Sequence, residues 1–82
     1  MRLTVRYFAA ARAAAGTDAV VVDVTPESTM ADLEATLADG NPELARVLNR
    51  CSYLRDAAAL YDRTVPLGEC ATLDVLPPFA GG

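Results

Sequence analysis

Residues 2–24, RLTVRYFAAARAAAGTDAVVVDV, contain two strand patterns separated by an alanine-rich stretch. In residues 2–7 apolar side chains alternate with Arg and Thr, and in residues 19–24 valine recurs at every second position. This period of two is typical of half-buried strands. Between the strands, residues 9–15 favour a short helix that Gly16 ends. We therefore predict that the two strands pair as an antiparallel hairpin.

The middle of the chain carries the signals of two further helices. Residues 29–32 match a capping box, with an acidic residue where a helix N-terminus favours one, and Gly40 is expected to end that helix. Asn41 and Pro42 suit the cap and first turn of another short helix. The apolar faces are expected to comprise Met30, Leu33 and Leu37 in the first helix and Leu44, Val47 and Leu48 in the second.

Short strands and turns are predicted for the second half of the chain. Residues 57–61 predict a strand, and residues 62–63 and 66–68 carry turn residues. Residues 73–76 predict a last strand, which ends at the following prolines because proline has no N–H to donate. The order strand, strand, helix and strands predicts an α+β domain with its helices on one face of the sheet.

The composition indicates one small domain. At 82 residues the chain is near the lower limit for a single hydrophobic core, and its 52% hydrophobic content is ample for one. The apolar runs are too short to span a membrane. The net charge of −4 argues against nucleic acid as a partner and favours a basic protein surface instead. We expect a cytoplasmic protein with no signal peptide before the first strand.

The residue types that are missing argue against independent catalysis. There is no His, and all seven cations are Arg, so the chain has no imidazole base, no His metal ligand and no lysine for a Schiff base. Cys51 and Cys70 form no CxxC pair, and we interpret them as ordinary thiols rather than a sulfur relay. Arg46 and Arg50 are interpreted as a solvated helix face rather than a docking site. We expect no turnover by the protein alone and no bound metal.

Residues 77–82, PPFAGG, allow two interpretations. They are either an unstructured end or cloning remnant, or an extended, flexible tail that follows a domain formed by residues 1–76. In the second case the prolines keep the backbone extended, and Phe79 offers one apolar anchor. Six extended residues reach about 20 Å at roughly 3.3–3.6 Å each. Such a tail suits a narrow channel, to which it would deliver the carboxylate of Gly82.

Two stretches resemble a known family. VRYFAAARAAAGTD at residues 5–18 and LDVLPPFAGG at residues 73–82 are similar to the small subunit of molybdopterin synthase, in a family of ubiquitin-like β-grasp sulfur carriers. The resemblance implies a mixed sheet of four to five strands with helices on one face. It also implies that an adenylating, ubiquitin-activating-like enzyme uses ATP on the Gly82 carboxylate. A sulfurtransferase then forms a thiocarboxylate, and the large synthase subunit passes its sulfur to a pterin precursor.

The same resemblance assigns the site residues. Gly82 would carry the reacting carboxylate, next to Gly81, and the protein itself would bind no cofactor. The residues expected to contact partner proteins are Phe8, Leu60, Leu76, Pro77, Pro78, Phe79 and Ala80. Phe8, Leu60 and Leu76 have a second interpretation as ordinary core residues.

Three other functions stay open from the sequence. The sulfur could serve thiamine, cysteine or another thio-metabolite instead of the molybdenum cofactor. The protein could be a ubiquitin-like modifier attached through Gly82 to substrate lysines, although without Lys it could not form lysine-linked chains with itself. It could also be an interaction module whose tail is incidental.

Overall fold

Five strands and three helices make up residues 1–78, the part of the chain that the computed structural model describes. In chain order these elements are β1 (Arg2–Tyr7), α1 (Ala9–Ala15), β2 (Ala19–Asp23), α2 (Met30–Leu37), α3 (Pro42–Leu48), β3 (Ser52–Arg55), β4 (Ala58–Leu60) and β5 (Thr72–Leu76). The predicted α+β class is confirmed.

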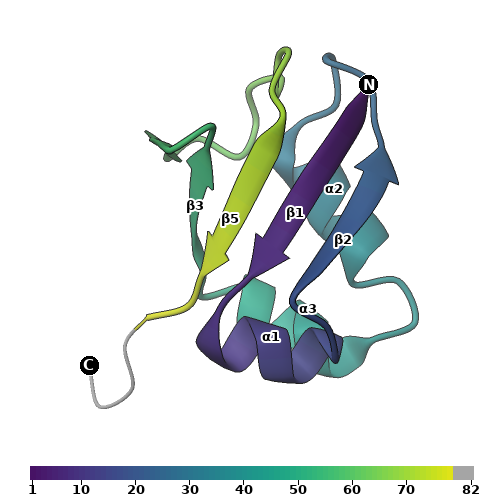
Figure 1. The fold of residues 1–82 in the computed structure, drawn as a ribbon, viewed down its shortest axis with the longest axis vertical. Coiled ribbons are helices and arrows are strands. Elements are labelled where there is room, and N and C mark those ends of the chain that lie inside the picture. Colours follow the sequence, from purple (N-terminus) through teal and green to yellow (C-terminus); the bar gives the residue numbers. More distant parts are fainter. Residues whose placement is uncertain (79–82) are drawn as a thin grey trace.

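The strands form one mixed sheet in the order β2-β1-β5-β3-β4. Its central pair, β1 and β5, is parallel, and the other three pairs are antiparallel. Helices α2 and α3 lie behind the sheet in Figure 1, and α1 crosses its lower end, where β1 and β5 both finish. The opposite face of the sheet carries no helix among the described residues, and we call it the open face.

The predicted hairpin of β1 and β2 is confirmed, and helix α1 lies in its connection. Gly16 ends α1 with φ of 77°, a left-handed conformation that suits glycine, and its N–H donates to the Arg12 carbonyl at 2.9 Å. The Asn41 side chain donates to the Ala14 carbonyl at 3.0 Å. This bond fixes the end of α1 against the start of α3.

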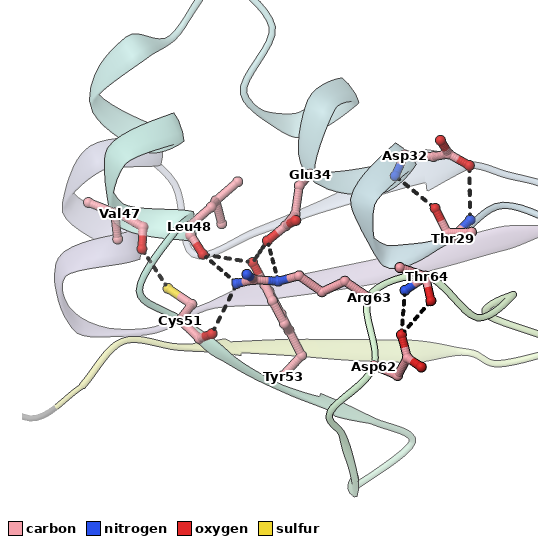
Figure 2. Close-up of polar contacts among 10 residues, drawn as sticks. All are labelled: Thr29, Asp32, Glu34, Val47, Leu48, Cys51, Tyr53, Asp62, Arg63 and Thr64. Carbon is pink, nitrogen blue, oxygen red and sulfur yellow. Dashed lines mark hydrogen bonds and ion pairs between the residues drawn. The ribbon is translucent and has the colours of Figure 1, made fainter.

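Both predicted helix caps are present. Thr29 Oγ1 accepts from the Asp32 N–H at 3.1 Å, and Asp32 Oδ2 accepts from the Thr29 N–H at 3.0 Å, as Figure 2 shows. Asn41 Oδ1 accepts from the Leu44 N–H at 3.0 Å. Helix α2 ends at Leu37, before the predicted stop at Gly40, because the chain already turns after Ala38.

The core lies between the sheet and the helices. Its fully buried large side chains are Leu3, Val5, Met30, Leu33, Leu44, Leu48, Leu67, Leu73 and Val75. Of the predicted α2 face, Met30 and Leu33 are buried, whereas Leu37 is only partly buried at the margin of the core. Leu67 was predicted to lie in a turn, and the structure places it in the core.

Strand β3 is not predicted by the sequence pattern, and β4 is shorter than the predicted strand 57–61. The two strands form a hairpin whose connecting residues, Asp56 and Ala57, have φ of 47° and 69°. Positive φ at both central positions is the geometry of a type I′ turn, which usually contains glycine. Asp56 Oδ1 also accepts from the backbone N–H groups of Ala71 and Thr72, both at 2.9 Å, and these bonds lower the pKa of its carboxyl group.

Replacing Leu33 with Ala is expected to cost about 2–5 kcal/mol, because it removes a fully buried side chain and leaves a cavity. The same change at Leu37 is expected to cost clearly less, since that side chain is partly exposed. Urea unfolding of both variants measures the difference. Equal losses would show that the inner face of α2 is assigned wrongly.

Replacing Ala57 with Gly is expected to stabilise the protein by about 0.5–1 kcal/mol. The left-handed conformation destabilises a non-glycine residue by about 1–2 kcal/mol, and glycine removes this strain. Glycine also raises the conformational entropy of the unfolded chain, which lowers the free energy of unfolding by only about 0.4–1 kcal/mol. The matched control is Ala58→Gly in β4, which removes no strain and is expected to destabilise. The turn assignment fails if thermal unfolding shows both variants to be destabilised.

Candidate functional site

The chain leaves the sheet from the end of its central strand. Leu76 is the last residue of β5 and pairs with Ser52 of β3, while the Phe8 N–H donates to the Val75 carbonyl at 3.3 Å. Pro77 follows and has no N–H to continue the ladder. Because β5 is held on both sides, the point at which residues 77 and 78 leave the sheet is fixed by the fold.

Three of the seven predicted contact residues belong to the domain of residues 1–76, and the structure brings two of these three together. Phe8 continues the alternation of β1 onto the open face and is 40% exposed. Leu76 lies on the same face, since its neighbour Val75 is buried on the helix side. Leu60 pairs with the buried Tyr53 on the other face, at the edge of the sheet. Phe8 and Leu76 are therefore neighbours beside the chain exit, and Leu60 is not part of that patch.

The remaining predicted site residues belong to the C-terminal segment. Pro77 is half-buried and Pro78 is exposed. Phe79, Ala80, Gly81 and Gly82 lie outside the described residues, so their roles stay predictions.

An ion pair that sequence reasoning missed lies on the open face. Arg6 Nε and Nη2 donate to the two carboxylate oxygens of Asp74 at 2.6 and 2.8 Å. Asp74 is only 8% exposed, and its carboxylate raises the pKa of the Arg6 guanidinium. The pair joins β1 to β5 beside Phe8 and Leu76. The alternation of residues in β1 is enough to place Arg6 on this face. Its pairing with Asp74 depends on the register of the parallel β1–β5 pair, which the alternation does not contain.

A second polar cluster lies on the helix side, at the end of α3. Tyr53 Oη donates to Glu34 Oε2 at 2.6 Å and also lies 3.1 Å from the Leu48 carbonyl oxygen. Arg63 Nε lies 3.1 Å from the same Glu34 oxygen, and its guanidinium stands 5.6 Å from the centre of the Tyr53 ring (Figure 2). Burial and the Glu34 carboxylate raise the pKa of Tyr53, so its hydroxyl stays protonated. The cluster fixes the loop after β4 against α2 and α3.

Burial raises the pKa of both thiols. Cys51 is buried, its Sγ donates to the Val47 carbonyl at 3.2 Å, and burial raises its pKa to about 11. Burial also raises the pKa of Cys70. The thiols lie at opposite ends of the sheet, because Cys51 precedes β3, Cys70 precedes β5, and those strands are antiparallel. Within residues 1–78 no group of acidic or Cys side chains is placed to hold a metal ion, and no helix is long and apolar enough to cross a bilayer.

Cys51 is expected to react with iodoacetamide far more slowly than Cys70 in the folded protein at pH 8. With a pKa of about 11, only about one Cys51 in a thousand is a thiolate at that pH, and its sulfur is also buried. Peptide mass mapping after timed alkylation measures both rates, and unfolding in urea is expected to equalise them. Faster labelling of Cys51 than of Cys70 would return it as a candidate sulfur relay.

Comparison with solved structures relates the chain to two groups of proteins. SAMP1 from Haloferax volcanii is 26% identical over the full length of both chains, with a TM-score of 0.77. A chain described as molybdopterin converting factor subunit 1 from Pyrococcus furiosus is 16% identical over 96% of this chain and 99% of its own, with a TM-score of 0.79. A complex of subunits 1 and 2 of molybdopterin-converting factor from Helicobacter pylori contains a chain 20% identical over the full length of both, with a TM-score of 0.70.

No protein-family model and no curated protein matches the chain. The shared feature with these solved structures is the arrangement of a five-stranded mixed sheet and its helices. The chain therefore has the ubiquitin-like β-grasp fold of the small archaeal modifier proteins and of subunit 1 of molybdopterin-converting factor.

Proposed function

We propose that the protein is a sulfur carrier that works through the carboxylate of Gly82 in molybdopterin biosynthesis. The observation that carries this proposal is the full-length structural likeness to subunit 1 of molybdopterin-converting factor, on a chain that continues from β5 into PPFAGG. A tail without side chains at its end allows close contact with an enclosing channel.

The proposed cycle has three steps. The Gly82 carboxylate attacks the α-phosphorus of ATP on an activating enzyme, and pyrophosphate leaves. A persulfide sulfur from a sulfurtransferase then attacks the acyl carbon, AMP leaves, and reduction of the remaining S–S bond by a thiol releases the thiocarboxylate. In the large subunit that sulfur attacks a carbon of the pterin precursor, the C–O bond at that carbon breaks and its oxygen substituent leaves. Water then hydrolyses the resulting thioester, which returns the carboxylate and leaves the sulfur on the pterin.

The side chains of this protein fit a carrier that depends on other enzymes. A carboxylate is a poor electrophile until it is activated, and the chain supplies neither His nor Lys to help. Cys51 is buried and protonated at neutral pH. What the folded domain offers is a fixed exit for the tail, with Phe8 and Leu76 beside it as contacts for a large subunit. The use of ATP and of cellular thiols favours the cytoplasm.

A ubiquitin-like modifier is the second candidate, favoured by the likeness to SAMP1 from Haloferax volcanii. In that case a substrate lysine, rather than sulfur, would attack the activated Gly82 carbonyl. Both functions use the same adenylation step, and they differ in the nucleophile that displaces AMP. A carrier for a different thio-metabolite would share the first two steps of the proposed cycle.

Deletion of Gly82 is expected to abolish sulfur loading and transfer. It withdraws the carboxylate by about 3.3–3.6 Å, and a misplacement of about 1 Å can already cost roughly 100-fold in rate. Extension of the chain beyond Gly82 is expected to be as damaging, because the carboxylate then becomes an amide. The assay combines activating enzyme, ATP, a sulfur source and large subunit, and intact-protein mass spectrometry detects the exchange of one oxygen for sulfur.

An amino-terminal extension of equal length is the control and is expected to be tolerated. Covalent adducts on lysines of other proteins, without the sulfur-containing form, would favour the modifier. Sulfur loading of the extended protein at the normal rate would exclude the Gly82 carboxylate as the reacting group under either function.

A further inference from the structure

A groove of about 450 Å³ lies at the sheet edge formed by β4, and its lining includes Leu60, which the family resemblance predicted to contact a partner protein. It runs between the end of α3 and the β3–β4 hairpin. Its lining residues include Arg50, Ser52, Ala59, Leu60, Tyr61 and Arg63. Since Ser52 pairs with Leu76, one end of this groove, which we call the β4 groove, lies next to the chain exit.

Arginines line the β4 groove, although the protein as a whole is acidic. The chain has a net charge of −4, yet the described residues that line the groove include two arginines and no carboxylate. Arg63 is held by Glu34, which balances its charge. Arg50 is exposed and makes no ion pair within residues 1–78, so its guanidinium can pair with a carboxylate of a partner.

One carboxylate adjoins the groove lining in sequence. Asp62 lies between Tyr61 and Arg63, and its Oδ1 accepts from Thr64 N and Oγ1 at 2.8 and 2.6 Å (Figure 2). These bonds lower the pKa of Asp62, which stays charged, and it forms no ion pair with Arg50 within residues 1–78. Arg46 lies one helical turn before Arg50 and is paired with Glu43 at 2.6 Å. The two arginines interpreted from the sequence as one solvated face are therefore in different environments.

The edge of β4 has free backbone groups beside the same groove. The two-residue turn makes Arg55 and Ala58 a hydrogen-bonded pair, so Leu54 and Ala59 form a pair without hydrogen bonds between them. The Asp56 N–H donates to the Thr72 carbonyl at 3.0 Å. Residues 54 and 56 therefore direct their backbone groups toward β5, which agrees with the absence of hydrogen bonds between Leu54 and Ala59. The N–H and C=O of Ala59 consequently point away from β3, and an extended peptide can pair with them.

Exposed apolar surface adjoins this free edge. Tyr61 follows β4 and is 92% exposed, and Leu60 is partly buried on the groove wall. Tyr and Arg are the side chains most often found at the energetic centre of protein interfaces. The combination of an aromatic anchor, a free cation and an open strand edge is complementary to a peptide with apolar and acidic residues.

We propose that the β4 groove binds an extended, acidic segment of a partner protein, which adds to the sheet beside β4. Its carboxylates lie against Arg50, its backbone pairs with Ala59, and an apolar side chain packs on Tyr61 and Leu60. This binding is independent of the sulfur chemistry proposed for Gly82.

The test uses the peptide acetyl-Glu-Val-Glu-Val-Asp-Glu-amide and the ¹⁵N-labelled full chain, followed by two-dimensional NMR. Amide shifts are expected to concentrate in residues 49–53 and 59–63. Binding is expected to weaken as salt is raised, because the charges are solvent-exposed. A peptide with Lys in place of each acidic residue is expected to give no shifts at these amides.

Two pairs of variants separate the groove from general charge effects. Arg50→Glu is expected to weaken binding at least about tenfold, whereas Arg46→Glu changes the net charge equally and is expected to leave it nearly unchanged. Tyr61→Ser is expected to weaken binding, and Val21→Ser, on the opposite edge strand, is not. Thermal unfolding checks that each variant is folded, as all four side chains are exposed.

Several results would overturn the proposal. They are absence of shifts with the acidic peptide, shifts centred on the open face around Arg6, and equal effects of the two arginine variants. Concentration-dependent shifts of residues 59–63 without peptide would assign the groove to a second copy of the chain. A change in those amides on removal of residues 79–82 would assign it to the chain's own C-terminal segment.

Discussion

Strands β1 and β5 pair side by side at the centre of the sheet, although 68 residues separate Arg6 from its partner Asp74. Closing so long a loop costs conformational entropy before the pairing contributes anything. Two features offset that cost: the burial of Leu3 and Val5 beside Leu73 and Val75, and the doubly bonded ion pair on the open face. Every other strand is added to one side or the other of this pair.

The same pairing sets the direction in which the chain leaves the domain. Because β5 is parallel to β1 and is bonded to β3 on its other side, its end cannot fray as an edge strand does. Pro77 then ends the ladder for lack of an N–H. The domain therefore fixes the position at which residues 77 and 78 begin. A partner enzyme that binds Phe8 and Leu76 would be placed at a fixed position relative to that point. Under the proposed function, this positioning is what the fold contributes.

Local signals in the sequence predicted the elements that depend on local physics. The alternation of β1 and β2, the capping box at Thr29 and the Asn41-Pro42 start of α3 were all correct. Strand β3 was missed because only four residues form it and Tyr53 is its only buried residue. The ion pair of Arg6 with Asp74 and the separation of Leu60 from Phe8 and Leu76 depend on register between distant strands, which no local pattern contains.

Under the proposed function, the partner protein is recognised mainly through the folded domain. In residues 77–82 only Phe79 has a large side chain, so a channel has few features of this segment by which to distinguish it from similar chains. Under the two proposals, both the open face and the β4 groove take part in recognition, the first with Phe8, Leu76 and an ion pair, the second with Arg50 and Tyr61. Ser52 lies at the junction, level with Leu76 and on the wall of the groove. A partner that engages the exit and the groove together makes its second contact at high effective concentration, and a protein that fits only one surface does not gain this advantage.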